Sequence, residues 1–189
     1  MKKVLLLVVT LTIALLAHAQ ASVQVGFLLN NLKAENAEVG KVAGAYKGMM
    51  AVADYNIHLT EFLGIAPGLG IDYSFNNQVG YRYKELGLLA PVDVNYCLSV
   101  NDNLSLSLFA GPTFYYGLFA KETSVNPPYD YYKNDSKRFD VALGGGFWLD
   151  IMENIRVKLG YKFGLTNTSR TAGTVYRNNI MSITVGYVF

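Results

Sequence analysis

The sequence predicts an all-β protein, specifically an eight-stranded antiparallel up-and-down transmembrane β-barrel. Three observations lead to this fold class. Apolar residues recur at every second position, most clearly in residues 85–119, and a period of two is typical of strands. Residues 85–100 keep this alternation throughout, well beyond the ~5–6 residues of a usual soluble strand. One face is continuously apolar and the other small or polar, which is the pattern of outer-membrane barrels.

The first three strands are expected at residues 20–30, 49–59 and 63–75. In each, the second face carries small or polar residues, among them Asp54 and Asp72. The expected outward residues are Val23, Val25, Phe27 and Leu29, then Met49, Ala51, Ala53, Tyr55, Ile57 and Leu59, then Leu63, Ile65, Pro67, Leu69, Ile71, Tyr73 and Phe75.

A hairpin follows, with strands at residues 85–100 and 104–119. Asn101, Asp102 and Asn103 form its turn, because Asn and Asp tolerate the backbone angles of a tight connection. The expected outward residues are Leu86, Leu88, Ala90, Val92, Val94, Tyr96, Leu98 and Val100, then Leu104, Leu106, Leu108, Ala110, Pro112, Phe114, Tyr116 and Leu118.

Three further strands, at residues 138–149, 155–165 and 181–189, bring the number to eight. Their expected outward residues are Phe139, Val141, Leu143, Gly145, Phe147 and Leu149, then Ile155, Val157, Leu159, Tyr161, Phe163 and Leu165, then Met181, Ile183, Val185, Tyr187 and Phe189.

Turn lengths set the expected orientation. Short turns fall at Thr60, Asp102 and Glu153, whereas residues 31–47, 76–84, 120–137 and 167–177 are longer polar connections. Outer-membrane barrels have short periplasmic turns and longer external loops. We therefore expect four external loops and, because the strand number is even, both termini in the periplasm.

Two features of the strands call for local backbone adjustments. Pro67, Pro91 and Pro112 lack the N–H that a ladder needs, so we expect bulges there. The run Gly144-Gly145-Gly146 is better explained by strand curvature in a tight barrel than by phosphate binding.

The first 19 residues form an expected signal peptide. Two lysines precede an uncharged apolar run at residues 4–17, and Ala17-His18-Ala19 supplies small residues at the positions that a signal peptidase reads. The run is shorter than the ~20 residues of a spanning helix. We expect Sec-type export, cleavage between Ala19 and Gln20, and a barrel domain of residues 20–189 in the bacterial outer membrane.

Composition narrows the functional classes. Without the two leader lysines, 14 basic residues balance 14 acidic ones, so nothing invites nucleic acid, and no polybasic stripe points to an anionic membrane surface. Cys97 is the single cysteine and cannot form an internal disulfide. The chain has 14 Tyr and 10 Phe, which suit aromatic girdles at the bilayer interfaces.

Charged residues occur on the inward faces in both signs. An eight-stranded barrel is just wide enough for side chains to fill, and a charge buried alone is costly. We expect a self-neutralising plug, with an ion or proton path as the alternative. The residues are Asp54, Asp72, Glu85, Asp93, Arg138, Asp140, Arg156, Lys158 and Lys162.

Catalysis is not expected. After cleavage His58 is the remaining histidine, and it has no convergent nucleophile or acidic partner in the sequence pattern. No metal-ligand cluster, nucleophile elbow or phosphate loop is present, so no cofactor is expected.

Two sets of aromatic residues are candidates for contacts with other proteins. Tyr129, Tyr131 and Tyr132 follow Pro127-Pro128 in the longest non-periodic stretch and could form a recognition surface. The alternative is that they extend the outer aromatic girdle. Tyr187 and Phe189 end the chain in the pattern that barrel-assembly machinery reads.

The chain resembles the PorT-like family of small outer-membrane barrels, related in architecture to the OmpX and OmpA barrels. Four motifs carry the resemblance across the mature chain: Phe109-Ala110-Gly111-Pro112 with Lys121 downstream, Ala90-Pro91-Val92-Asp93-Val94-Asn95-Tyr96, Gly164-Leu165-Thr166-Asn167, and Val185-Gly186-Tyr187-Val188-Phe189. The resemblance implies the barrel fold. It also implies a role in protein secretion for a few members.

These observations predict a non-enzymatic integral outer-membrane barrel with a side-chain-plugged interior and a structural or adhesive role through its external loops. Its expected partners are outer-membrane lipid, the assembly machinery during biogenesis, and a surface ligand or secretion partner. The alternatives are an accessory subunit of a secretion or transport assembly, a small-solute pore and a lipid-modifying enzyme.

Overall fold

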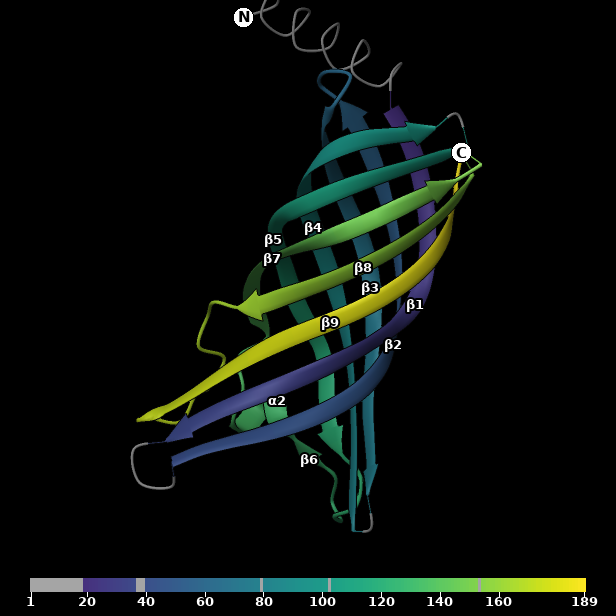
Figure 1. The fold of residues 1–189 in the computed structure, drawn as a ribbon. Coiled ribbons are helices and arrows are strands. Elements are labelled where there is room, and N and C mark those ends of the chain that lie inside the picture. Colours follow the sequence, from purple (N-terminus) through teal and green to yellow (C-terminus); the bar gives the residue numbers. More distant parts are fainter. Residues whose placement is uncertain (1–18, 37–39, 79, 102, 153) are drawn as a thin grey trace, which may run out of the picture.

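The computed structural model describes residues 19–36, 40–78, 80–101, 103–152 and 154–189. In these residues eight long antiparallel strands form a ring (Figure 1). They are β1 (Ala19–Asn36), β2 (Gly40–His58), β3 (Leu63–Gln78), β4 (Tyr81–Asn101), β5 (Leu104–Glu122), β7 (Phe139–Ile151), β8 (Ile155–Gly164) and β9 (Thr174–Val188). The short strand β6 (Tyr129–Asp130) and the one-turn helix α2 (Tyr131–Asn134) lie between β5 and β7. No helix in the described part of the chain is long and apolar enough to cross a membrane.

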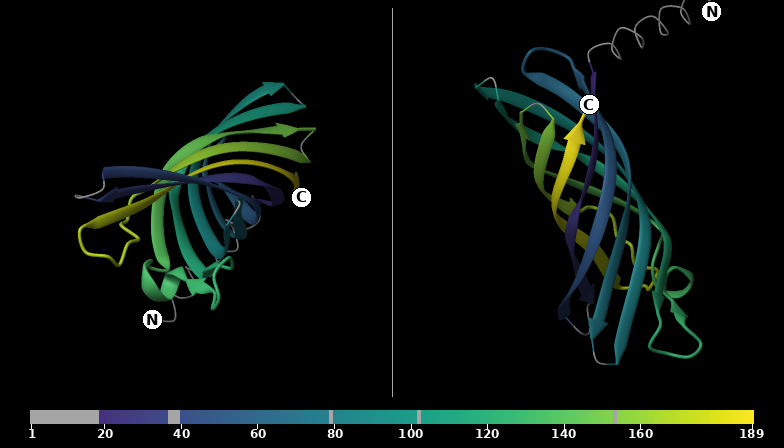
Figure 2. Two further views of the ribbon diagram at one scale, coloured as in Figure 1. Left: turned by 90° about the horizontal axis from the view of Figure 1, so that it is seen from below. Right: turned by 90° about the vertical axis from the view of Figure 1, so that its right-hand side faces the viewer.

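The ring closes because the first and last strands pair with each other. β1 pairs with β9 from Ser22↔Val188 to Asn36↔Thr174, and each remaining long strand pairs with its two neighbours around the ring (Figure 2). The short strand β6 pairs with the end of β5 through Lys121↔Asp130. The predicted fold class is confirmed.

Side-chain burial alternates along the strands in the predicted phase, with the polar face inside. Gln24, Asp93 and Arg156 are almost fully buried. Phe27 and Leu69 are 68% and 72% exposed. The polar interior and apolar exterior are the reverse of a water-soluble protein, as expected for a barrel surrounded by lipid hydrocarbon.

The two ends of the barrel differ. Thr60 and Asn101 lie in short turns at one end, which we call the terminal end because β1 begins and β9 ends there (Figure 1). Asp102, in the same turn as Asn101, and Glu153, in the third predicted turn, lie outside the described residues, as do residues 1–18 of the expected signal peptide. The opposite end, the loop end, carries β6, α2 and the connection at residues 165–173.

Two of the four predicted external loops are wrong. Residues 31–36 and 40–47 continue β1 and β2 up to Asn36↔Gly40, and residues 76–84 continue β3 and β4 up to Gln78↔Tyr81. The predicted loop at residues 167–177 is also shorter, because β9 begins at Thr174. The sequence of these segments lacks the regular alternation of apolar and polar residues, although their backbone pairing continues.

The predicted bulges at the prolines are wrong as well. Pro67, Pro91 and Pro112 each interrupt pairing with one neighbour and keep it with the other, without a shift of register. A residue's N–H points to one neighbour only, so a proline removes one bond and needs no inserted residue. The register shifts of β4 and β5 lie elsewhere, at Leu86/Gly87 and Ser99/Asn101.

The triple glycine of β7 allows neighbouring strands to approach closely. A Cβ on Gly144 or Gly146 would collide with the backbone of β8, and one on Gly145 would collide with the carbonyl of Phe109. This agrees with the interpretation that these glycines serve strand curvature.

A cation on the lipid face should destabilise the barrel. Leu69→Arg places a charge in the middle of the outward face of β3, at an expected cost of ~2–4 kcal/mol. Asn103→Arg, in an exposed turn, is the control and should cost little. Denaturant unfolding in lipid vesicles measures both, and equal effects would contradict the assigned lipid face.

Candidate functional site

The terminal half of the lumen is occupied by an arginine bound on three sides. Arg156 donates from Nε to Asp150 Oδ1 at 2.6 Å and from Nη2 to Asp150 Oδ2 at 2.9 Å. Its Nη1 lies 3.5 Å from Asp54 Oδ1, and its guanidinium sits 4.6 Å from the ring centroid of Trp148. A bidentate pair with an aromatic face is a strong arrangement for a buried cation.

The carboxylate of Asp54 extends this cluster across β1 and β9. It accepts hydrogen bonds from Ser22 Oγ at 2.7 Å and from Gln24 Nε2 at 2.5 Å. Gln24 Oε1 in turn accepts from Thr184 at 2.7 Å. Four strands, β1, β2, β8 and β9, are therefore tied together through side chains inside the lumen.

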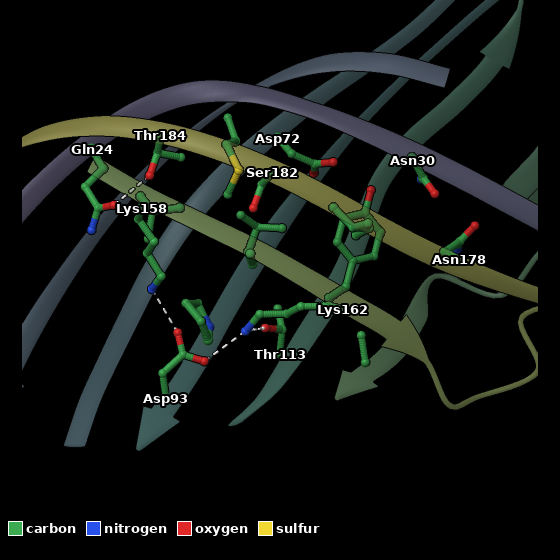
Figure 3. A pocket seen from close by; sticks show the side chains of 18 of the residues that line it. Gln24, Asn30, Asp72, Asp93, Thr113, Lys158, Lys162, Asn178, Ser182 and Thr184 are labelled. Carbon is green, nitrogen blue, oxygen red and sulfur yellow. Dashed lines mark hydrogen bonds and ion pairs between the residues drawn. The ribbon is translucent and has the colours of Figure 1, made fainter. Parts of the chain in front are cut away.

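A second ionic cluster lies in the middle of the barrel (Figure 3). Lys158 and Lys162 each place Nζ 2.9 Å from an oxygen of Asp93, which is 1% exposed. Lys162 also donates to Thr113 at 2.5 Å. Lys158 lies 4.3 Å from the ring centroid of Phe109, whose ring stacks on Trp148 at 5.4 Å.

The loop half of the lumen is acidic. Glu85 accepts from Tyr83 at 2.9 Å, from Tyr115 at 3.0 Å and from Tyr132. Asp140 accepts from Thr166 and, at 3.2 Å, from Asn178. Among the described residues, neither carboxylate takes part in an ion pair, and the same holds for Asp72. Phenols, hydroxyls and amides replace cations as partners here.

The predicted interior charges therefore fall into separate groups. Arg156, Lys158 and Lys162 neutralise carboxylates in the terminal half and the middle. Arg138 instead lies at the loop end, where Nη1 donates to Gly117 O at 2.9 Å and the guanidinium covers the Tyr132 ring at 5.1 Å. Asp72 is buried, and its Oδ1 has no hydrogen-bond partner in the described structure.

Two small cavities remain between these groups. One, of ≈ 80 Å³, lies in the middle of the lumen (Figure 3), and one, of ≈ 100 Å³, lies under the loop end. Each could hold several waters, since one water needs ~10–15 Å³. Both cavities are lined by Asn30, Glu85, Tyr115, Asp140 and Asn178.

The three tyrosines of the predicted recognition loop occupy different environments. Tyr132 is 5% exposed and points to Glu85. Tyr131 is half-buried and donates to Glu122 at 3.0 Å. Burial, together with that carboxylate, raises the pKa of Tyr131 to about 12. Tyr129 packs edge-on against Tyr131 at 5.1 Å and donates to Asp135 at 2.7 Å. Asp130 caps α2 by accepting from the N–H groups of Tyr132 and Lys133.

The remaining candidates are dispersed. His58 Nε2 lies 3.3 Å from Asn56 Nδ2, and Cys97 is a half-buried free thiol. No group of three or more His, Cys, Asp or Glu in the described part of the chain could hold a metal ion. Tyr187 and Phe189 both face outward and pack edge-on at 5.0 Å.

Sequence reasoning missed several members of the lumen clusters, among them Asp150, Tyr83 and Tyr115. Asp150 comes directly after the last residue of the predicted strand and two residues after the inward Trp148. Extending the predicted strand by one residue would therefore have placed Asp150 on the inward face. Tyr83 falls in a predicted loop. Tyr115 is inward by pattern, but its bond to Glu85 depends on the register between β4 and β5.

The closed ring, the apolar exterior and the ionic interior define an integral membrane β-barrel. The outer membrane protein beta-barrel domain family matches residues 4–189, and the chain belongs to this family of outer-membrane proteins. No curated protein sequence matches the chain significantly.

Two solved structures show the same architecture. Ail, the attachment invasion locus protein of Yersinia pestis, is 13% identical over 91% of this chain and 99% of its own, with a TM-score of 0.53. Neisserial surface protein A (NspA) is 15% identical over 89% of this chain and 99% of its own, also with a TM-score of 0.53. At these identities the likeness concerns the fold alone.

Removal of the buried arginine should unfold the barrel more easily. Arg156→Met leaves Asp54 and Asp150 without their cation, at an expected cost of ~3–5 kcal/mol. Lys133→Met, on exposed α2, is the control for loss of one positive charge. Denaturant midpoints in lipid vesicles compare the two, and matching midpoints would refute a stabilising role of the Arg156 cluster.

Proposed function

We propose that this protein is a non-enzymatic outer-membrane barrel with a blocked lumen that acts through its loop end, in a structural or adhesive role. The observation that carries the proposal is the filling of the lumen by the Arg156, Trp148, Phe109 and Asp93 clusters. Arginine and lysine side chains inside the lumen lie 2.6–2.9 Å from carboxylate oxygens. Solute passage would require these ion pairs to break.

An outward-facing loop end supports the adhesive role. An even strand number puts both termini on the same side of the membrane, and the short turns at that end support its assignment to the periplasm, with the loop end outside. Tyr187 and Phe189 are the proposed signal for the assembly machinery. Ail and NspA are named an attachment protein and a surface protein. Barrels of this architecture can therefore serve such roles, although the proposal for this chain rests on its own loop end.

The β6–α2 segment is the proposed recognition surface. Residues 123–128 are exposed, and the segment behind them is fixed by the Asp130 cap and by the contacts of Tyr131 and Tyr132. A fixed segment loses less entropy on binding a partner. Of the three tyrosines, Tyr129 is the one available for recognition, whereas Tyr132 is buried and directed to Glu85 inside the barrel, which supports neither recognition nor an outer girdle for that residue.

The second candidate function is an accessory subunit of a secretion or transport assembly, as the resemblance to the PorT-like family allows. Purification from detergent-solubilised membranes separates the candidates, because a stable, stoichiometric partner complex favours the subunit. A solute pore and a lipid-modifying enzyme rank below both, given the filled lumen.

A blocked lumen predicts no conductance. Purified protein reconstituted in a planar bilayer should give no reproducible ohmic steps in moderate salt, because Arg156, Lys158 and Lys162 remain paired with carboxylates. An established porin reconstituted in the same way is the positive control. Steps from the pure protein that survive repeated purification would favour the pore.

Loss of the recognition tyrosines should reduce adhesion without unfolding the barrel. The double variant Tyr129→Ser/Tyr131→Ser keeps the contact between Tyr132 and Glu85, so a heat-modifiable barrel should still form. Vesicles carrying it should bind matrix proteins and epithelial cells several-fold less than vesicles with the parent. Tyr96→Ser/Tyr116→Ser, which removes two exposed lipid-facing rings, is the matched control. Equal adhesion of the variant and the parent would contradict recognition by this segment.

A further inference from the structure

A row of lysines crosses four adjacent strands on the outside of the barrel. Lys47 of β2 pairs with Phe75 of β3, Phe75 pairs with Lys84 of β4, and Lys84 pairs with Lys121 of β5. All three lysines are exposed. Neighbouring strands lie ~4.8 Å apart, so the row places three positive charges close together on one side of the wall.

These lysines have no acidic partner in the described structure. None takes part in an ion pair. The acidic residues beside the row along the chain, Glu85 and Glu122, accept hydrogen bonds from tyrosines instead. Lys84 and Lys121 are directly opposite each other, and like charges in that position destabilise a sheet. The arrangement therefore calls for an anion from outside the chain.

The row lies at the level expected for lipid headgroups. Phe75 is part of the row. Tyr73 and Phe119 both pair with Leu86 and lie two residues along their strands from the row, toward the apolar belt. Aromatic residues mark the membrane–water interface, and lysine stems extend along apolar surface while the ammonium stays in the headgroup layer.

An apolar groove begins directly beside the row. Lys47 lines its rim, together with Phe75, Phe27, Met49 and Met181, and its volume is ≈ 430 Å³. A second apolar groove, of ≈ 700 Å³, shares Phe27, Met49 and Ile183 with the first and continues along Val25, Ala51 and Ile71. The small side chain of Ala51 lies between its cross-strand partners Val25 and Ile71, which leaves the surface hollow there.

We propose that this face of the barrel is a binding site for a phosphate-bearing membrane lipid. Lys47, Lys84 and Lys121 bind the phosphate groups, and an acyl chain lies in the grooves along β9, β1, β2 and β3. The charge of the lysine row and the apolar grooves beside it match the two parts of one amphiphile. A soluble acidic polymer would satisfy the lysines and leave the grooves unused. The site is independent of the adhesive role of the loop end.

The test measures lipid binding to the purified barrel in detergent micelles by titration and native mass spectrometry. The probe is dioleoyl phosphatidic acid, with dioleoylglycerol as the same chains without phosphate and inorganic phosphate as the free anion. We expect saturable binding of phosphatidic acid, weak binding of dioleoylglycerol and no competition from inorganic phosphate at equal concentration.

Two pairs of variants assign the site. Lys47→Gln/Lys84→Gln/Lys121→Gln should weaken binding of phosphatidic acid roughly a hundredfold, since each basic residue near a lipid surface contributes about 1 kcal/mol. Lys33→Gln/Lys133→Gln/Arg177→Gln removes the same charge from exposed positions outside the row and should change binding little. Ala51→Phe fills the groove and should weaken binding several-fold, whereas Ala110→Phe, on the lipid face of β5, should not.

Each alternative outcome overturns the proposal. Equal loss of phosphatidic acid binding in both triple variants would indicate nonspecific attraction to net charge. Equal binding by Ala51→Phe and Ala110→Phe would show that the groove does not hold an acyl chain. Competition by inorganic phosphate would indicate a free-anion site. Absence of saturable binding to the parent would exclude the lipid site, provided that heat-modifiable mobility shows all five proteins folded.

Discussion

Backbone hydrogen bonding in the absence of water is the constraint on which this structure depends. An unpaired N–H or C=O in hydrocarbon costs several kcal/mol, so a sheet that crosses a bilayer must close. The pairing of β1 with β9 removes the last free edges of the ring. The three prolines show that the sheet tolerates a local loss of pairing, because each proline lacks pairing with one neighbouring strand only. The register of the wall is therefore kept where single bonds are lost.

Closure forces the polar groups inward, and the interior must then satisfy them. Strands from opposite parts of the sequence supply the partners, as with Asp93 on β4 and the lysines of β8. The solution differs along the barrel axis. Ion pairs fill the terminal half and the middle, whereas tyrosine hydroxyls and amides surround the carboxylates of the loop half. The neutral part of the lumen thus lies on the side of the chain termini, and the acidic part lies beneath the loop end.

The loop end has two structural features, a divergence of the strands and an anchored segment. β2 and β3 separate beyond Lys47↔Phe75, so β1, β2 and β9 diverge from β3, β4 and β5 while each set stays paired (Figure 1). The β6–α2 segment stays anchored to β5 through Glu122 and Glu85, which bind Tyr131 and Tyr132. The segment also packs into a small hydrophobic cluster, in which Tyr132 lies against Tyr83 and Ala120.

The sequence by itself determined the strand number and which side chains face lipid, because inside the bilayer the two faces of a strand meet opposite environments and the alternation records this. It did not determine where strands end. The sequence of residues 31–47 shows no regular alternation of apolar and polar residues, although the backbone of residues 31–36 and 40–47 pairs. Only the tertiary structure decided which charges meet. Asp150 joins Arg156 through a turn. Lys47, Lys84 and Lys121, each 37 residues from the next, form one row because cross-strand register places Lys47 and Lys84 opposite Phe75, and Lys121 opposite Lys84.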